Sequence, residues 1–439
     1  MIDGMSPDSP ASFRPIHYLG NKARFLEHIE AAVAGVRRKE GVALDLFSGS
    51  GVVSRALAMR QSTISVDIQA YSQVLADALT RPAAITEVLL HSIAAEVSQH
   101  VAKLPKPIRS LMVLEQEAIK SANSPLLADI LESGSLIAGR PSGSTFADLH
   151  HQARHSIEHA GPENTMLCYY GGVYFSYSQA AELDAIVKAV RSLPGDARTT
   201  GLAAAMGVAS ELTSTVGNHF AQPIRPRTRD GAIKTGWTRR ICKVRSVAPL
   251  QVFMHYCAKY LELSPALYPC TPIKGDYRAV LSSLNEGDVG VVYADPPYTR
   301  DHYSRFYHVL ETLALGDDPG ISVVPGAPDR PSRGLYRLQR HQSPFSIRTE
   351  VVAAFSQLFE ECKRLSAPLV LSYSPSGAGT KARPQPRLMT IPQITDLAGG
   401  YFSKIAVVAT GRVAHSKFNS QALNGEIDYD AEVLIVCGP

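Results

Sequence analysis

The chain has 439 residues, 45% of them hydrophobic, and its formal net charge is +4 at pH 7. This length is sufficient for two domains, and a mean hydropathy of −0.03 without an apolar run of membrane-spanning length argues against an integral membrane protein. The six cysteines have no C-x-x-C spacing, so neither a disulfide framework nor a metal site is expected. The first ten residues contain no apolar core, and we therefore expect a cytoplasmic protein without a secretory signal.

A strand, a glycine turn and a helix are predicted near the N-terminus. Residues Ala43–Gly51 form an apolar run that ends in glycines, and Val52–Leu57 continue with helical periodicity. Gly49 and Gly51 allow the backbone to approach a ligand closely. Next, Ile64–Asp67 predicts a second strand that ends in an acid suited to ribose hydroxyls. The segment is typical of a nucleotide-binding βα unit.

The ligand predicted for this unit is poor in phosphate. Ser54 occupies the third glycine position of the G-x-G-x-x-G pattern, and no phosphate-binding lysine follows the loop. S-adenosylmethionine contains no phosphate and therefore fits better than a nicotinamide dinucleotide. A nicotinamide-dependent oxidoreductase stays open as an alternative.

The segment between Asp67 and Asp276 is too long for an ordinary βα connection and should contain a separate domain. Apolar periodicity predicts that this domain is mainly helical. The predicted helices lie at about 85–101, 110–131, 179–192, 202–215 and 247–262. Residues 168–175 predict a glycine-bent strand or loop.

Two groups of side chains in this segment have competing functional and structural interpretations. The first group is Tyr169, Tyr170, Tyr174 and Tyr177. These tyrosines could contact DNA. Aromatic residues at this density are more often core residues, and we prefer the core interpretation. His151, His155 and His159 have helical spacing, and without an acidic or cysteine partner nearby they predict a solvated helix face and not a metal site.

The positive charge is concentrated between Pro223 and Arg245, where eight cations accompany the single acid Asp230. Such a segment suits phosphate neutralisation, and some of its arginines could read guanine edges. A basic surface loop without a ligand is the alternative. The candidate DNA-binding residues here are Arg225, Arg227, Arg229, Lys234, Arg239 and Arg240.

The most informative motif is Asp295-Pro296-Pro297-Tyr298, which follows the apolar run Val289–Ala294. An exocyclic amino group is a poor nucleophile until its hydrogens are held out of conjugation with the ring. The Asp295 carboxylate and the Pro296 carbonyl offer two acceptors, and the prolines fix the backbone direction. Tyr298 offers an aromatic face to a base. The motif predicts an amino-methyltransferase that works through positioning and charge stabilisation.

A cytosine-C5 methyltransferase would instead attack the base with a thiolate, usually within a Pro-Cys-Gln setting. Pro269-Cys270 is the one Pro-Cys pair of the sequence, and threonine follows it instead of glutamine. We therefore predict that Cys270 is a loop or core residue.

Cations and aromatic residues follow the catalytic turn, before a helix predicted through 310–313. A base inside a duplex must be extruded to react, and side chains near Tyr298 would fill or brace the gap. The candidates for this role are Arg300, Tyr303 and Arg305. Residues 316–348 are rich in Pro, Gly and Arg, and they form either a clamp that orders on DNA or a disordered loop.

The C-terminal part predicts three further strands, at 368–373, 405–408 and 432–436. We expect the last two to pair antiparallel. Arg412 and Lys417 lie in their connection and are candidate phosphate contacts.

Taken in order, these motifs resemble the Dam-like family of DNA adenine-N6 methyltransferases over about residues 14–80 and 270–439. The resemblance implies that Tyr18 and Lys22 contact the cofactor and that Asp276 lies near its adenine. With the neighbours of these positions, the candidate cofactor-binding residues are Tyr18, Lys22, Asp45, Phe47, Gly49, Gly51, Asp67, Ile68, Asp276, Tyr277 and Asp295. The implied fold is α/β, a Rossmann-like S-adenosylmethionine-dependent methyltransferase sheet that is mainly parallel with its last strand antiparallel. A mainly helical target-recognition domain would be inserted into it.

The sequence therefore predicts a site-specific DNA adenine-N6 methyltransferase that uses S-adenosylmethionine and flips its target adenine. Adenine is preferred because N4-cytosine enzymes commonly begin the tetrapeptide with serine. The candidate catalytic residues are Asp295, Pro296, Pro297 and Tyr298. We expect residues 14–80 and 269–439 to form the catalytic domain and 81–268 the recognition domain.

Two other functions stay open, an RNA adenine-N6 methyltransferase and a noncatalytic DNA-binding protein with a methyltransferase fold. A restriction endonuclease or another defence component is a candidate partner beside DNA. The recognised base sequence cannot be derived from these motifs, because base readout depends on geometry.

Overall fold

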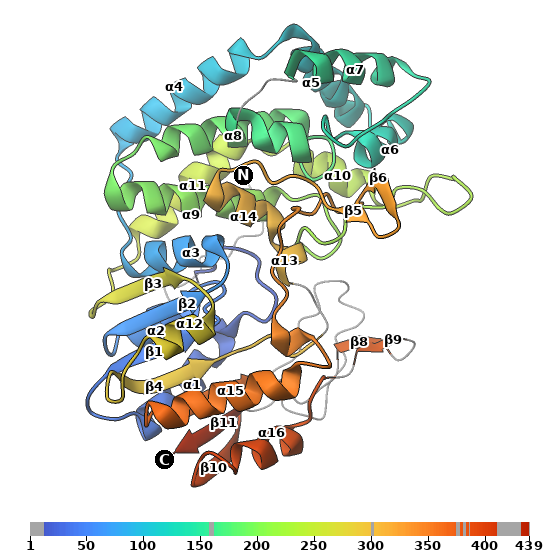
Figure 1. The fold of residues 1–439 in the computed structure, drawn as a ribbon. Helices are drawn as coiled ribbons and strands as arrows, with labels where there is room; N and C mark the ends of the chain where they lie inside the picture. Colours follow the sequence, from blue (N-terminus) through green and yellow to red (C-terminus); the bar gives the residue numbers. More distant parts are fainter. Residues whose placement is uncertain are drawn as a thin grey trace. The chain divides into compact units, whose positions relative to one another are not determined.

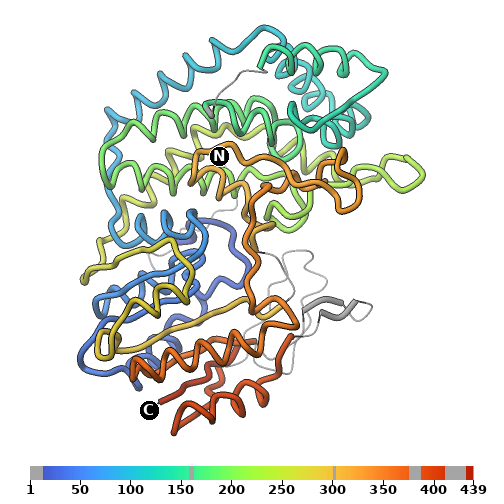
Figure 2. Tube along the Cα trace, viewed as in Figure 1, coloured from blue at the N-terminus to red at the C-terminus, as the bar shows by residue number. Residues whose placement is uncertain are grey.

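The computed structural model describes residues 13–157, 162–299, 303–374, 378–380, 383–385, 387–410 and 432–438. The chain divides into two compact units. The helical unit comprises residues 1–17, 82–263 and 305–340, and the sheet unit comprises 18–81, 264–304 and 341–439. The chain thus leaves the sheet unit twice and returns twice, as can be followed in Figure 2.

The sheet unit contains, in its described residues, a seven-stranded sheet with the order β10-β11-β7-β4-β1-β2-β3 (Figure 1). The strands are β1 Val42–Leu46, β2 Thr63–Asp67, β3 Cys270–Lys274, β4 Val289–Ala294, β7 Leu369–Tyr373, β10 Lys404–Ala409 and β11 Val433–Gly438. All neighbours from β7 to β3 pair in parallel, whereas β11 is antiparallel to both β7 and β10. The prediction of an α/β fold with a mainly parallel sheet and an antiparallel last strand is confirmed.

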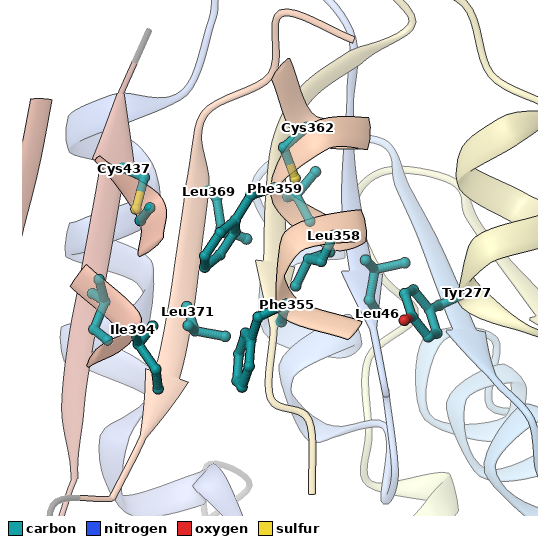
Figure 3. Close-up of a cluster of buried hydrophobic side chains, with 14 of the residues drawn as sticks. Leu46, Tyr277, Phe355, Leu358, Phe359, Cys362, Leu369, Leu371, Ile394 and Cys437 are labelled. Carbon is teal, nitrogen blue, oxygen red and sulfur yellow. The ribbon is translucent and has the colours of Figure 1, made fainter. Parts of the chain in front are cut away.

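Helices pack against both faces of this sheet. The other elements of the unit are η2 Lys22–Phe25, α1 Leu26–Val36, α2 Val52–Ala58, α3 Ala70–Thr80, α12 Tyr277–Ser282, η5 Pro344–Ser346, α15 Val351–Arg364, α16 Ile391–Ala398 and the small hairpin β8 Ala378–Thr380 with β9 Arg383–Gln385. One core cluster joins the sheet to α12, α15 and α16 (Figure 3), and a second joins it to α1 and α2.

The central strands are apolar on both sides because both faces are covered. Along β7, Leu369 and Leu371 point into the cluster with α15, while Val370 lies in the cluster with α1 and α2. Figure 3 shows Phe355 and Phe359 of α15 against this side of the sheet. Full burial of each such side chain contributes roughly 1.5–3 kcal/mol. This explains why the strands are near-continuous apolar runs in the sequence.

The helical unit is built mainly from helices, as predicted for the inserted segment. They are α4 Glu87–Lys103, α5 Lys106–Lys120, α6 Ser124–Ser133, α7 Thr145–Ile157, α8 Tyr177–Arg191, α9 Gly195–Leu212, α10 Thr238–Arg245, α11 Pro249–Leu261 and α14 His308–Leu315, with the short turns η3 Pro162–Asn164 and η4 Met166–Tyr170. In the described part of the chain, none of the helices is both long enough and apolar enough to cross a membrane.

Two predictions for this unit are wrong in detail. The single helix expected at 110–131 is two helices, because Ala122 adopts a φ of +49° and the Asn123 side chain caps α6 by accepting a hydrogen bond from Leu126 N. The strand or loop expected at 168–175 begins instead as the π-helical turn η4. The buried Asp184 carboxylate accepts the N–H groups of Met166 and Leu167 at 2.9 and 2.8 Å and so fixes the start of that turn.

Residues 305–340 belong to the helical unit, although the sequence-based boundaries assigned them to the catalytic domain. They contain α14 and the hairpin β5 Val323–Val324 with β6 Ala327–Pro331, and the short helix α13 Tyr303–Phe306 marks the passage into this segment. The buried Arg337 donates to Asp317 at 2.6 Å and to Thr312 at 2.9 Å. Arg337 therefore links Asp317 to α14, and the two interpretations of 316–348, a clamp that orders on DNA or a disordered loop, stay predictions.

Candidate active site

A pocket opens in the sheet unit at the carboxyl ends of β1, β2 and β4, the usual position of ligands in an open parallel sheet. The turns after these strands supply most of its wall, together with residues 18–22, 275–277, 341–343 and 346. The predicted site residues that line it are Tyr18, Lys22, Asp45, Phe47, Gly49, Asp67, Ile68, Asp276, Tyr277, Asp295, Pro296, Pro297, Tyr298 and Tyr303. Gly51 caps α2 next to the pocket and is not part of the lining.

The Asp295–Tyr298 turn leaves β4 with Asp295, whose carboxylate is bound by a buried lysine. Lys22 Nζ lies 2.9 Å from Asp295 Oδ2 and 3.6 Å from Glu432 Oε2. Burial raises the pKa of Asp295 to about 6, against the opposing effect of the Lys22 ammonium. Burial alone would lower the pKa of Lys22, but the two carboxylates raise it above its ordinary value. Lys22 is therefore charged, and Asp295 ionises near pH 6, above the ordinary range of an aspartate.

The aromatic ring of Tyr298 lies beside this charge cluster. The Arg387 guanidinium lies over the ring, 4.2 Å from its centroid, and Tyr373 packs edge-on at 5.2 Å. Arg387 Nε donates to the carbonyl of Ser374 at 3.1 Å, which fixes the guanidinium. Tyr298 is thus a fixed aromatic surface next to Asp295.

The glycine turn and the end of β2 are joined by the Asp67 carboxylate. It accepts the N–H groups of Gly49 and Gln69, each at 2.9 Å, and burial raises its pKa. Gly49 has a φ of +53°, and a Cβ there would lie 2.6 Å from the Tyr18 hydroxyl oxygen. Glycine is therefore required both by the backbone conformation and by the close approach of Tyr18.

Ser54, which replaces the third glycine of the dinucleotide pattern, has a specific role. Its hydroxyl donates to Asp45 Oδ2 at 2.5 Å and lies 2.8 Å from Ser65 Oγ. Burial raises the pKa of Asp45 to about 7. The serine binds an acid beneath the turn, which a glycine could not do.

Aromatic side chains surround another part of the pocket. Phe47 adopts a φ of +74° directly after β1 and packs against Tyr277 at 5.1 Å and Phe345 at 5.4 Å between ring centroids. Asp276 caps α12 by accepting a hydrogen bond from Arg278 N, and the Arg278 side chain holds the pKa of Asp276 below its ordinary value. This region combines flat apolar surfaces with a carboxylate, as a purine-binding site would.

The pocket has unused hydrogen-bonding capacity and an excess of acid. Within the described residues, five buried polar atoms of its lining have no hydrogen-bond partner: Asp45 Oδ1, Ser48 Oγ, Tyr277 Oη, Tyr293 Oη and Ser343 Oγ. Four aspartates line the pocket, whereas Lys22 is the one lysine or arginine among the described lining residues and is already bound by carboxylates. A polar ligand with a positive charge and no phosphate fits this lining.

Sequence reasoning missed three residues that contact the pocket lining. Glu432 and Arg387 come from segments without a recognisable motif, and Phe345 lies in the Pro-, Gly- and Arg-rich stretch. The glutamate at the start of the last predicted strand was the one available signal, because an acid next to an apolar strand at the ligand edge of a sheet can face the site.

Some of the predicted DNA-binding residues of the helical unit line one groove, and others lie outside it. A basic groove, defined by its lining cations, contains Arg225, Arg227, Arg229, Lys234, Arg330 and Arg333. Arg227 is already paired with Asp129 at 2.7 Å and Glu132 at 2.6 Å. Arg239 and Arg240 are exposed on α10 outside the groove lining. Arg305 lies over the Tyr336 ring at 5.6 Å, and Arg300, Arg412 and Lys417 fall outside the described residues.

The prediction that the four tyrosines of this unit are core residues is confirmed for three of them. Tyr170, Tyr174 and Tyr177 are buried core residues, and Tyr169 is partly exposed and bonds to Asp318. His151 and His155 are exposed on α7, while His159 is outside the described residues. In the part of the chain that the structure describes, no cluster of three or more His, Cys, Asp or Glu side chains is arranged to hold a metal ion.

Cys270 begins β3 and is buried in the sheet unit. Burial raises the pKa of its thiol to about 12, so it lacks the thiolate character that attack on cytosine C5 requires. The prediction of a core cysteine is confirmed.

A mainly parallel sheet with a pocket at the carboxyl ends of its strands is consistent with a methyltransferase fold. A family model described as D12 class N6 adenine-specific DNA methyltransferase matches residues 18–105 and 271–364. The matched segments include the glycine turn and the D-P-P-Y motif. The resemblance inferred from the motifs is confirmed, and the match supports an adenine-specific DNA methyltransferase.

A curated relative is the modification methylase LlaI of Lactococcus lactis subsp. lactis. It is 27% identical over 146 residues, which are 33% of this chain and 20% of that protein. The chain therefore spans about a fifth of the length of this relative.

Proposed function

We propose that this protein transfers a methyl group from S-adenosylmethionine to the N6 amino group of a flipped adenine at specific sites in DNA. The observation that carries the proposal is the pocket that combines Asp295 and Tyr298 with Gly49 and Asp67. The pocket lining contains four aspartates and one lysine, so it favours a positively charged sulfonium cofactor over a nicotinamide dinucleotide, which carries phosphates. The D12 family match favours adenine in DNA over the RNA alternative.

Different residues would hold the ribose, the adenine and the methionine part of the cofactor. The Asp67 carboxylate, which two backbone N–H groups hold in place, would accept hydrogen bonds from ribose hydroxyls. Phe47 and Tyr277 offer flat surfaces for the adenine ring. Tyr18 and Lys22 would contact the methionine part. Gly51, Ile68, Asp45 and Asp276 complete the proposed set.

S-adenosylmethionine supplies a methyl carbon on a positively charged sulfur, which departs with the bonding electron pair. The protein orients the attacking nitrogen. The Asp295 carboxylate and the Pro296 carbonyl would each accept one N6 hydrogen, so that the nitrogen lone pair leaves conjugation with the ring. Asp295 would take up the proton that N6 releases, and Tyr298 would stack on the base. The charge on Asp295 also stabilises the positive charge that develops at N6.

Incubation with isotopically labelled S-adenosylmethionine tests this function. Label should appear in unmethylated duplex DNA and not in an RNA of matched sequence. Label in RNA alone would move the function to RNA modification. Cofactor binding without label in either polymer would favour the noncatalytic DNA-binding protein.

Gly49→Ala should weaken cofactor binding strongly. The added methyl group lies within 3 Å of three Tyr18 ring and hydroxyl atoms, and alanine is strained at a φ of +53°. We expect at least about a tenfold loss in affinity for S-adenosylmethionine, equivalent to about 1.4 kcal/mol. Isothermal titration calorimetry measures the affinity for S-adenosylmethionine. Gly287→Ala is a control for backbone strain, because its φ is +93° and no atom lies within 4 Å of the added methyl group.

We further propose that the basic groove binds the DNA backbone. Arg225, Arg229, Lys234 and Arg330 are exposed there, so their cations are available for phosphates. Arg227, held by two carboxylates, would instead fix the groove wall. Arg239, Arg240, Tyr303 and Arg305 are proposed as further DNA contacts, as are Arg300 and Lys417.

The double change Arg229→Ala and Arg330→Ala should reduce the salt dependence of DNA binding. The slope of log affinity against log salt concentration is expected to fall by about 0.9 for each phosphate that the variant no longer neutralises. Fluorescence anisotropy at several salt concentrations measures this slope. Arg109→Ala, which removes an exposed cation of α5 outside the groove, is the control. Equal slopes for the double variant and the native protein would contradict the groove assignment.

A restriction-modification or defence setting is part of the proposal, because the relative is a modification methylase. In that setting a cognate endonuclease would cleave the same sites in unmethylated DNA. Protection of methylated plasmid DNA from such an endonuclease would support this partner.

A further inference from the structure

Lys22 connects the catalytic turn to a carboxylate from the far end of the chain. Its ammonium contacts Asp295 at 2.9 Å and lies 3.6 Å from Glu432 Oε2. Lys22 and Glu432 are each only 4% exposed, so water screens these charges little. Glu432 directly precedes β11 and lies outside both segments that match the family model.

The orientation of the Glu432 carboxylate is fixed by the neighbouring strands. Ser372 Oγ of β7 donates to Glu432 Oε1 at 2.9 Å, while Oε2 is the oxygen nearest Lys22. Thr410 Oγ1, just after β10, donates to the Glu432 carbonyl at 2.7 Å. The side chain and the backbone of Glu432 are therefore both held in place.

A second buried carboxylate is not needed to neutralise Lys22, because Asp295 already does so. The group of one lysine and two acids carries an excess negative charge, and a buried excess charge costs stability. Arg387, whose guanidinium lies over Tyr298, offsets part of this charge. The arrangement is therefore better explained by an effect on Asp295 than by an effect on stability.

We propose that Glu432 is a positioning residue for methyl transfer, which acts through Lys22 and keeps Asp295 a strong hydrogen-bond acceptor for the target amine. The inference rests on the proposed function of the site. If Glu432 were neutral, the ammonium would be drawn to Asp295 alone and would compete with the amine for its oxygens. With Glu432 charged, the ammonium lies between two carboxylates.

The charges around Asp295 determine the direction in which the pH dependence of activity should shift when Glu432 is changed. The groups that face it are Lys22 of η2, Asp45 of β1, Tyr293 of β4, Tyr298, Arg387 and Glu432. Burial raises the pKa of Asp295 to about 6, Lys22 and Arg387 lower it, and Glu432 raises it. Removing the charge of Glu432 therefore lowers this pKa. The acid limb of the activity profile should move to lower pH.

The experiment compares Glu432→Gln with Glu432→Asp and with the control Glu360→Gln, an exposed glutamate of α15. For Glu432→Gln we expect kcat to fall about 10- to 100-fold, with KM for DNA nearly unchanged and the acid limb at lower pH. Glu432→Asp should recover part of kcat and most of the pH profile. Glu360→Gln should behave like the native protein.

Two results would overturn the inference. One is native kcat in Glu432→Gln. The other is a reduced kcat with an unchanged acid limb, which would indicate a purely structural role. The pKa of Asp295, followed by carboxyl ¹³C NMR, separates this inference from the proposed function, since it can be measured without turnover. An unchanged pKa in Glu432→Gln contradicts the role of Glu432 even if the native protein transfers no methyl group.

Discussion

Asp295→Asn is expected to reduce methyl transfer to DNA by about 10³-fold or more while the protein stays folded. The amide keeps the size of the side chain but removes the negative charge that would polarise N6 and accept its proton. Lys22 retains Glu432 as a charged partner at 3.6 Å, so the substitution does not leave a buried lysine unpaired. The measurement is single-turnover transfer of labelled methyl groups, with circular dichroism to verify the fold.

The same carboxylate predicts a pH dependence. Since the pKa of Asp295 is raised to about 6, transfer by the native protein should decline as the pH falls through 6 and the carboxyl group becomes protonated.

The matched control for Asp295→Asn is Asp288→Asn, at the exposed turn before β4, which should leave the rate of methyl transfer unchanged. Native activity in Asp295→Asn would contradict the assignment of Asp295 as the acceptor.

Arg245→Met is expected to lower the free energy of unfolding of the helical unit by about 3–5 kcal/mol, because it leaves Glu115 as a buried, unpaired charge. Arg245 Nη1 contacts Glu115 Oε1 at 2.5 Å, and both side chains are almost completely buried. Arg245 Nη2 also donates to the Gly172 carbonyl at 2.8 Å, and Glu115 accepts Tyr177 N at 2.7 Å. Removal of the arginine thus affects several backbone contacts at once.

Urea denaturation followed by circular dichroism measures this effect. Lys243→Met, an exposed position on the same helix α10, provides the control and should change the free energy by less than about 0.5 kcal/mol. Adding Glu115→Gln to Arg245→Met should recover part of the stability, since it removes the unpaired charge. If Arg245→Met were as stable as Lys243→Met, the buried ion pair would have no structural role.

The residues that line the pocket of the sheet unit were predictable because most of them follow directly after strands. A run such as Val289–Ala294 followed by Asp295 identifies both a buried strand and the edge at which its last side chain emerges. Gly49 and Gly51 indicate a turn for a different reason. Their φ values of +53° and +79° are strained for residues other than glycine.

The missed residues depend on pairing that one segment cannot reveal. Glu432 reaches the site because β11 inserts antiparallel beside β7, and Arg387 reaches it through a segment without periodicity. In the helical unit, Arg227 and Arg245 belong to one basic segment of the sequence, but both are paired with distant acids. Asp129 lies 98 residues from Arg227 and Glu115 lies 130 residues from Arg245, so no local pattern could indicate these pairs.

The most direct test of the central claim is the identity of the methylated nucleoside. The native protein and Asp295→Asn are incubated with unmethylated DNA and labelled S-adenosylmethionine, the DNA is digested, and the nucleosides are separated by mass spectrometry. We predict label in N6-methyladenine with the native protein and none above background with the variant. Label in N4-methylcytosine, or no labelled nucleoside despite measured cofactor binding, would contradict the account.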